Sequence, residues 1–71
     1  MQTNKAHPLH DLRVRAKRTV AEVARLSGIT EAHWRRIGRL KSGVHASTVF
    51  GLEVGLNATI EEIMERLRPK P

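Results

Sequence analysis

Three arginines in the segment of residues 31–41 are the side chains with the clearest chemical meaning. Arg35, Arg36 and Arg39 are spaced so that, in an α-helix, all three lie on one side. A guanidinium group can bind guanine O6 and N7 through two parallel hydrogen bonds, and it also pairs well with phosphate. A carboxylate such as that of Glu31 can accept a hydrogen bond from cytosine N4. The segment therefore has the side chains needed to bind base edges and phosphates.

The other side of the same predicted helix is apolar, which argues against a merely solvated row of charges. Trp34 and Ile37 lie across the helical wheel from the arginines, and Glu31 is the one acid on the cationic side. Trp34 has a ring that can stack on a base, but its place beside Ile37 favours the core. Because only Trp34 and Phe50 are aromatic, the stacking platforms of RNA and single-strand binders are missing. Double-stranded DNA is the expected partner.

The residues before this segment predict a short helix and a tight turn that position it. Thr19 and Glu22 have the spacing of a capping box, so a helix begins directly after Thr19. Gly28 can take the left-handed conformation that ends a helix, and Thr30 is an N-cap for a helix over residues 31 to about 41. Only about three residues separate the two helices, so they must cross steeply, as in a helix-turn-helix.

Three further segments have apolar residues at helical spacing, and no segment alternates as a strand does. A second capping box, Thr59 with Glu62, begins the last of them, and Pro69 ends it. Gly51 and Gly55 lie four residues apart inside the fourth helix and suggest a close contact with another helix there. The sequence therefore predicts an all-α domain of five helices. The three segments are residues 9–17, 46–56 and about 60–68.

Charge is distributed unevenly along the 71 residues, whose net charge is +6. The range 1–45 holds ten Lys and Arg against three Asp and Glu, whereas 46–71 holds three against four. This excess of cations indicates an anionic partner for the first two thirds of the chain. We expect residues 1–8 to be a flexible arm, residues 9–68 to be the DNA-binding domain, and residues 69–71 to be a short tail.

Several functional classes are disfavoured by what the sequence lacks. There is no cysteine for a disulfide or thiolate site, and the four histidines show no ligand spacing with acids, so no metal is expected. No serine has the context of a nucleophile and no glycine-rich phosphate loop occurs, so we expect no enzyme activity, no cofactor and no small-molecule substrate. The apolar runs are too short for a membrane span, and a signal peptide is not evident. We expect a cytoplasmic protein.

Residues of about 9–67 resemble the lambda-repressor-like, or Cro/cI/XRE, family of DNA-binding domains. That resemblance implies a compact five-helix fold in which helices two and three form a helix-turn-helix that enters the major groove. It implies a phage or prokaryotic transcription regulator, most simply a small repressor of the Cro or immunity-repressor type that acts by occupying an operator. The matching residues are Thr19 through Ala24, Gly28-Ile29-Thr30, Ile37, Arg39, Leu52, Leu56, and Thr59 through Glu62.

The resemblance also assigns roles to single positions. Val20 stands where the family often has a glutamine, so one polar contact is missing. Gly38 stands where an acid often pairs with an arginine of helix one, which leaves Arg13 for phosphate. Arg36 is favoured for bases and Arg39 for phosphate. The expected base-reading residues are Thr30, Glu31, Ala32, Arg35 and Arg36. The expected phosphate-binding residues are Arg13, Arg39, Lys41, Ser42 and His45.

The fifth helix carries an apolar stripe that suggests a homodimer, because a two-fold dimer doubles the number of base contacts. Ile60, Met64 and Leu67 form the expected dimer interface, although the same stripe can cap the core.

Two alternative functions stay open. One is an antitoxin-type module that binds a protein partner and uses DNA secondarily. The other is a MerR-type or excisionase-type protein, whose pattern TVAEVARLSGIT also fits, but those families continue into a strand-containing wing.

Overall fold

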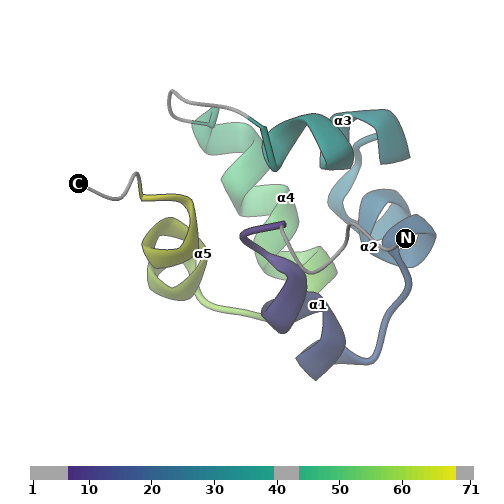
Figure 1. Cartoon of the computed structure of the whole chain (residues 1–71), viewed down its shortest axis with the longest axis horizontal. Helices are drawn as coiled ribbons and strands as arrows, with labels where there is room; N and C mark the ends of the chain where they lie inside the picture. Colours follow the sequence, from purple (N-terminus) through teal and green to yellow (C-terminus); the bar gives the residue numbers. More distant parts are fainter. Residues whose placement is uncertain (1–6, 40–43, 69–71) are drawn as a thin grey trace.

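We describe residues 7–39 and 44–68 of the chain in a computed structural model. These residues form five α-helices and no strand, which confirms the predicted all-α class. The longest helix has 11 residues, and within these two ranges no helix has the length and apolar character to cross a bilayer. In chain order (Figure 1) the helices are α1 (His10–Ala16), α2 (Val20–Ser27), α3 (Glu31–Ile37), α4 (Ala46–Leu56) and α5 (Ile60–Leu67).

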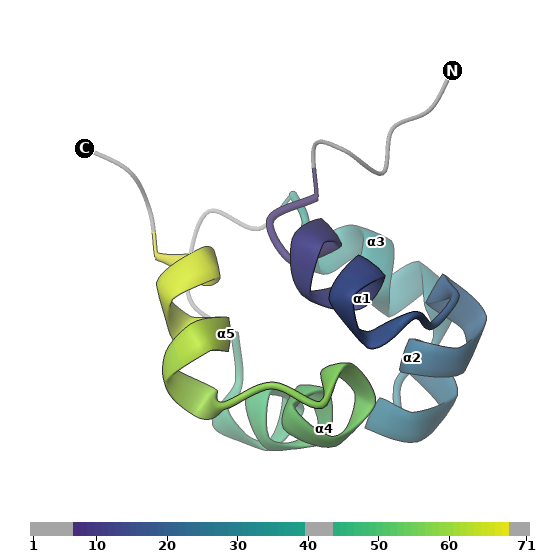
Figure 2. The ribbon, with the colours of Figure 1, turned by 90° about the horizontal axis from the view of Figure 1, so that it is seen from below.

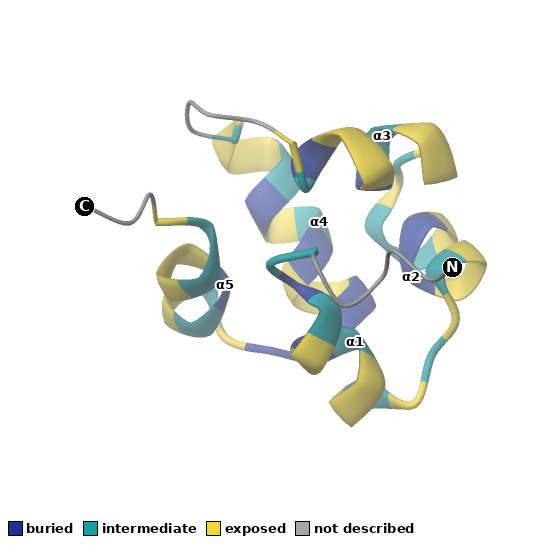
Figure 3. Cartoon of the chain, in the orientation of Figure 1, coloured by how far each residue is buried: buried dark blue, intermediate teal, exposed yellow. Residues whose placement is uncertain are grey.

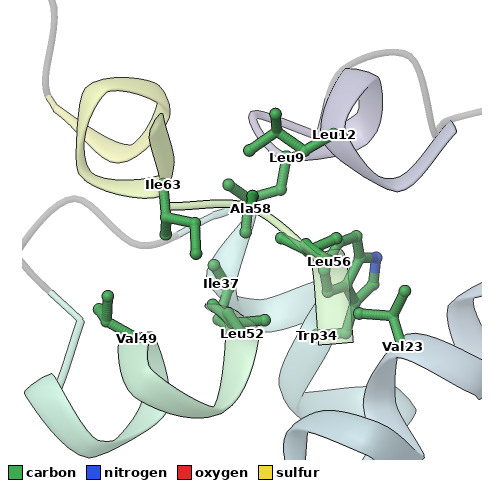
Figure 4. Packing of buried hydrophobic residues seen from close by; sticks show 10 residues of the cluster. All are labelled: Leu9, Leu12, Val23, Trp34, Ile37, Val49, Leu52, Leu56, Ala58 and Ile63. Carbon is green, nitrogen blue, oxygen red and sulfur yellow. The ribbon is translucent and has the colours of Figure 1, made fainter. Parts of the chain in front are cut away.

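Helix α4 lies at the centre of the fold, with α2 on one side and α5 on the other (Figures 1 and 2). The core forms where the inner sides of all five helices meet, and Trp34 is its largest fully buried side chain (Figure 4). Removing any one helix would expose apolar surface at a cost of roughly 25 cal/mol per Å². The other core residues are Leu9, Leu12, Val23, Ile37, Val49, Leu52, Leu56, Ala58 and Ile63.

The two glycines of α4 allow α2 to approach closely, as their spacing predicts. A Cβ atom on Gly51 would meet the backbone oxygen of Ser27 far inside contact distance. A Cβ atom on Gly55 would meet the Ser27 hydroxyl and lie 2.8 Å from the backbone oxygen of Val23. The lack of side chains at these two positions therefore sets the distance between α2 and α4.

We expect Gly51→Ala to lower the free energy of unfolding. Alanine favours a helix over glycine by about 1 kcal/mol, but overpacking against a backbone atom costs about 1–3 kcal/mol, and the Ser27 carbonyl cannot move without shifting α2. Chemical denaturation measures the change. Ser47→Ala is the matched control, because Ser47 is an exposed residue of the same helix, and its effect should stay within about 0.5 kcal/mol. A more stable Gly51→Ala protein would contradict the close contact.

The helix ends lie within about one residue of those that the sequence predicts, with one exception. Both capping boxes are present, at Thr19 with Glu22 and at Thr59 with Glu62. The exception is α3, which we expected to continue to about residue 41 but which ends at Ile37. Beyond it, the N–H groups of the next two residues bond to carbonyls three residues back, at 3.2 and 2.9 Å. This tightened turn replaces the last predicted helical turn.

The folded domain also begins earlier than predicted. His7 and Pro8, which we expected in the flexible arm, are half-buried. The His7 ring stacks on the Trp34 indole with ring centres 4.2 Å apart. Helix α1 starts at His10, one residue later than predicted, because Leu9 occupies the N-cap position and is fully buried. Residues 1–6 and 69–71 of the predicted arm and tail lie outside the described residues.

Two ion pairs connect α1 to α5. The Arg15 guanidinium donates to both carboxylate oxygens of Glu62, at 2.7 and 2.9 Å. The Arg66 guanidinium donates to the Asp11 carboxylate, with a shortest distance of 2.7 Å. The Arg15 hydrogen bonds, and then the Thr59 backbone N–H, lower the pKa of Glu62 from 4.5 to about 2. Glu62 thus caps its own helix and also holds α1.

This shift predicts an acid-sensitive contribution to stability. Because the folded-state pKa of Glu62 is lower than its unfolded-state value, the contribution is complete above about pH 4.5 and is lost as the pH falls toward about 2. We expect Glu62→Gln to melt at a lower temperature than the natural chain at neutral pH, and the difference to vanish near pH 2. Thermal melts followed by circular dichroism across this range provide the measurement.

Glu61→Gln is the control for that series, because Glu61 is an exposed neighbour on α5 that forms no ion pair with the described residues. Its melting temperature should follow that of the natural chain. A constant difference between Glu62→Gln and the natural chain at every pH would show that the carboxylate charge is not what connects α1 and α5.

Candidate nucleic-acid interface

The turn between α2 and α3 is held by backbone and side-chain caps. Gly28 has a φ of 77°, in the left-handed region that ends α2. The N–H of Ile29 then bonds to the Ala24 carbonyl at 2.9 Å, and the Ile29 side chain packs against the core. The Thr30 hydroxyl accepts from the His33 N–H at 2.9 Å and so begins α3. These contacts determine the direction in which α3 leaves the turn.

Helix α3 has one buried side and one exposed side, as predicted. Trp34 and Ile37 are each 2% exposed, which confirms Trp34 as a core residue. His33 is half-buried at the edge of the helix. Figure 3 shows that the outer side of α3 is largely exposed. All five expected base-reading residues are exposed there, namely Thr30, Glu31, Ala32, Arg35 and Arg36.

A hollow of about 470 Å³ lies beside α3 at its junction with the turn. Arg36 and Arg39 both border it, together with His33, and no carboxylate is among its lining residues. The structure therefore brings together two of the three arginines that the sequence singles out. The remaining lining residues are Gly28, Ile29, Thr30 and Ala32.

Arg35 differs from the other two arginines in its surroundings. It lies 4.0 Å from the Glu31 carboxylate, one turn earlier on α3. Both side chains are more than half exposed, so this ion pair is weak and can exchange for another partner. Arg35 and Glu31 therefore form a polar pair that does not line the hollow. The sequence pattern alone did not reveal this difference between Arg35 and the other two arginines.

The expected phosphate-binding residues are only partly brought together. Arg39 is exposed at the end of α3, and His45 is exposed at the start of α4. Arg13 is not the free cation that we expected, because its guanidinium donates to the Arg18 carbonyl at 2.8 Å and lies 3.5 Å from His10 Nδ1. Lys41 and Ser42 lie outside the described residues.

Most of the exposed large apolar side chains lie outside the α5 stripe. Ile60 and Leu67 are half-buried and pack against the core, and only Met64, at 49% exposure, projects outward. On α4, Phe50 and Val54 are 57% and 61% exposed. They lie four residues apart, on one side of that helix. Because α4 is apolar around most of its circumference, its sequence did not distinguish this side from the core-facing one.

The structure offers no metal site in residues 7–39 and 44–68, where no group of three histidines or acids gathers. Comparison with known proteins adds no identification, since no family model, curated protein or solved structure matches the chain.

Proposed function

We propose that the protein binds double-stranded DNA sequence-specifically, with α2 and α3 acting as a helix-turn-helix and α3 entering the major groove. The observation that carries this proposal is that Arg36 and Arg39 line the same hollow, and that no carboxylate is among its lining residues. The resemblance of the sequence to the lambda-repressor-like family supports it. The net charge of +6 is consistent with it, because neutralising phosphates and releasing counterions supplies much of the affinity for DNA.

The exposed side of α3 divides into base-reading and phosphate-binding groups in this proposal. The major groove is about 12 Å wide and admits one α-helix, whose first turns come nearest to the bases. Arg36 lies within the helix and would bind guanine O6 and N7. Arg39 follows the helix and would hold phosphate. Thr30, Glu31, Ala32 and Arg35 would complete the base-reading surface, with Arg35 exchanging its weak pair with Glu31 for DNA.

Regulation by simple occupancy fits a domain of this size. A bound protein excludes polymerase or a competing regulator from the same DNA, so no catalytic or ligand-binding site is required. One domain reads a short site, and a two-fold homodimer would read two half-sites about one helical turn apart. We therefore propose a small transcriptional repressor, which acts as a homodimer on a pseudo-palindromic operator.

A second candidate is a protein-interaction module of the antitoxin type. The exposed side chains of Phe50 and Val54 favour it, because neighbouring exposed apolar residues often mark a protein contact. Co-purification of a small protein partner would support this function. The excisionase-type alternative fits less well, because the described residues after α3 form two helices and no strand.

The test of DNA reading begins with selection of bound sites from random duplex DNA. We expect Arg36→Ala to lose about 1–3 kcal/mol of binding free energy at one base step, and its selected sites to relax at that step alone. Competition binding with single-base variants of the selected site measures the change. An unaltered sequence preference would remove Arg36 from the base-reading group.

Arg39→Ala is the matched comparison, because it removes a guanidinium from the same hollow. It should weaken all duplex sequences alike and reduce the slope of log affinity against log salt by about one unit. Arg25→Ala serves as the control, since Arg25 is exposed on α2 and is not a lining residue of the hollow. If the protein selects no duplex at all, the proposed function is wrong.

For the homodimer, we expect Met64→Glu to convert a dimer to a monomer at micromolar concentration in sedimentation experiments. Met64 is the most exposed of the three residues expected at the interface, and a buried unpaired carboxylate opposes association. Val54→Glu on α4 is the control and should leave the dimer intact. A natural chain that stays monomeric both free and on DNA would end the dimer proposal, whereas dissociation by Val54→Glu alone would move the interface to α4.

A further inference from the structure

The side chain of His7 connects the N-terminal segment to α3 through three contacts. Its ring lies parallel to the Trp34 indole, with 7° between the planes. Its Nδ1 atom accepts from the Leu9 N–H at 3.1 Å, and its Nε2 atom lies 2.8 Å from the Trp34 carbonyl oxygen. Because Nδ1 is an acceptor here, the ring proton must be on Nε2, which donates to the carbonyl. These contacts need the neutral Nε2–H form of the ring.

The carbonyl that His7 binds is one that the end of α3 releases. In a continued α-helix the Gly38 N–H would bond to the Trp34 carbonyl. Here it bonds to the Arg35 carbonyl instead, at 3.2 Å. His7 therefore supplies a hydrogen-bond donor at a half-buried helix end, where an unpaired carbonyl would be costly.

Gly38 provides the space for this contact. A Cβ atom there would lie 2.8 Å from His7 Cδ2 and 3.3 Å from both Cγ and Nε2. The backbone of Gly38 is in the ordinary right-handed region, with φ of −66°, so any residue could adopt it. A side chain at this position would therefore displace the His7 ring, so glycine matters here for the space it leaves and not for its conformational freedom.

We infer that His7 is a positioning residue for the cationic side of α3, which it holds in place through the neutral form of its ring. Trp34 and Gly38 stand on either side of Arg35 and Arg36 along the chain, and Arg39 follows Gly38 directly. The contact with His7 therefore holds the end of α3 next to all three arginines. Any effect of this contact on DNA binding rests on the proposed function, whereas the contact itself does not depend on that function.

The surroundings of His7 oppose its protonation. Burial lowers the pKa of His7 below 6.5, and the nearby His10 and Arg13 of α1 lower it further, while the hydrogen bond to Trp34 acts in the opposite direction. On the α3 side the ring lies next to Trp34 and Gly38, neither of which has an ionisable group. A proton on Nδ1 would face the Leu9 N–H. The contribution of His7 to stability is therefore complete above about pH 6.5 and is lost as the pH falls toward its folded-state pKa.

The first test is nitrogen-detected NMR of the histidine rings in the natural chain. We expect His7 to be the Nε2–H tautomer at neutral pH and to titrate below 6.5. The fluorescence of Trp34, the one tryptophan of the chain, should change with the same midpoint, and His7→Gln should abolish that transition. An Nδ1–H tautomer, or a midpoint at or above 6.5, would overturn the inference.

The second test compares three variants. His7→Gln keeps an N–H donor for the Trp34 carbonyl but cannot be protonated. His7→Leu removes the donor and keeps apolar bulk, and Gly38→Ala displaces the ring. In the last two, amide exchange at the end of α3 should be about fivefold faster, as loss of one net hydrogen bond implies, with α5 unaffected. In His7→Gln, amide exchange at the end of α3 should stay as slow as in the natural chain. Unchanged exchange in both His7→Leu and Gly38→Ala would disprove the positioning role.

The third test measures affinity for a duplex selected by the natural chain. His7→Leu and Gly38→Ala should bind it about fivefold more weakly with an unchanged salt slope, because positioning is lost while the phosphate contacts remain. Between about pH 7.5 and 5.5, the affinity of the natural chain should fall relative to that of His7→Gln, because the ratio of the two affinities cancels pH effects that the proteins share. If the natural chain binds no duplex, the proposed function fails, and tautomer and exchange data alone decide the role of His7.

Discussion

The burial of Trp34 is the constraint on which the rest of the structure depends. Its side chain is the largest in the core and is 2% exposed. With this ring and Ile37 turned inward, the rotation of α3 about its own axis is determined, because a helix has only one way to place both on the inner side. Arg35 and Arg36 then have to face outward, and Arg39, just after the helix, is exposed as well. The indole also provides the surface on which His7 stacks, so the same residue connects the core, α3 and the N-terminal segment.

The arginines of the domain differ in whether another group of the protein already binds them. Arg15 and Arg66 are paired with acids between α1 and α5, at the side of the fold formed by those two helices. Arg13 and Arg18 donate to backbone carbonyls. On α3, by contrast, Arg35 has only a weak partner, and the hollow bordered by Arg36 and Arg39 is lined by no acid. Arg36 and Arg39 are therefore cations of the α3 side that an anionic partner could bind without displacing an acid.

Local signals predicted most of the fold because each acts over a few residues. The capping boxes at Thr19 and Thr59 begin α2 and α5 as expected, and the glycine pair of α4 marks a close helix contact. The exposure of the residues that we expected to read bases was also predictable, since the helical period alone separates them from Trp34. The end of α3 was not, because a tightened turn and a continued helix differ by a shift in hydrogen bonding that no single residue type dictates.

The five helices, their order and the division of α3 into apolar and cationic sides were predictable from the sequence, because these depend on caps and periodicity within one segment. Only the tertiary structure decided which polar groups are used and which are free. In the folded protein Arg13 donates to a backbone carbonyl, and His7 lies against Trp34, 27 residues away. Ile60 and Leu67 are half-buried, whereas Phe50 and Val54 are exposed. Such contacts join residues that are distant along the chain, so they arise only from the way the helices pack.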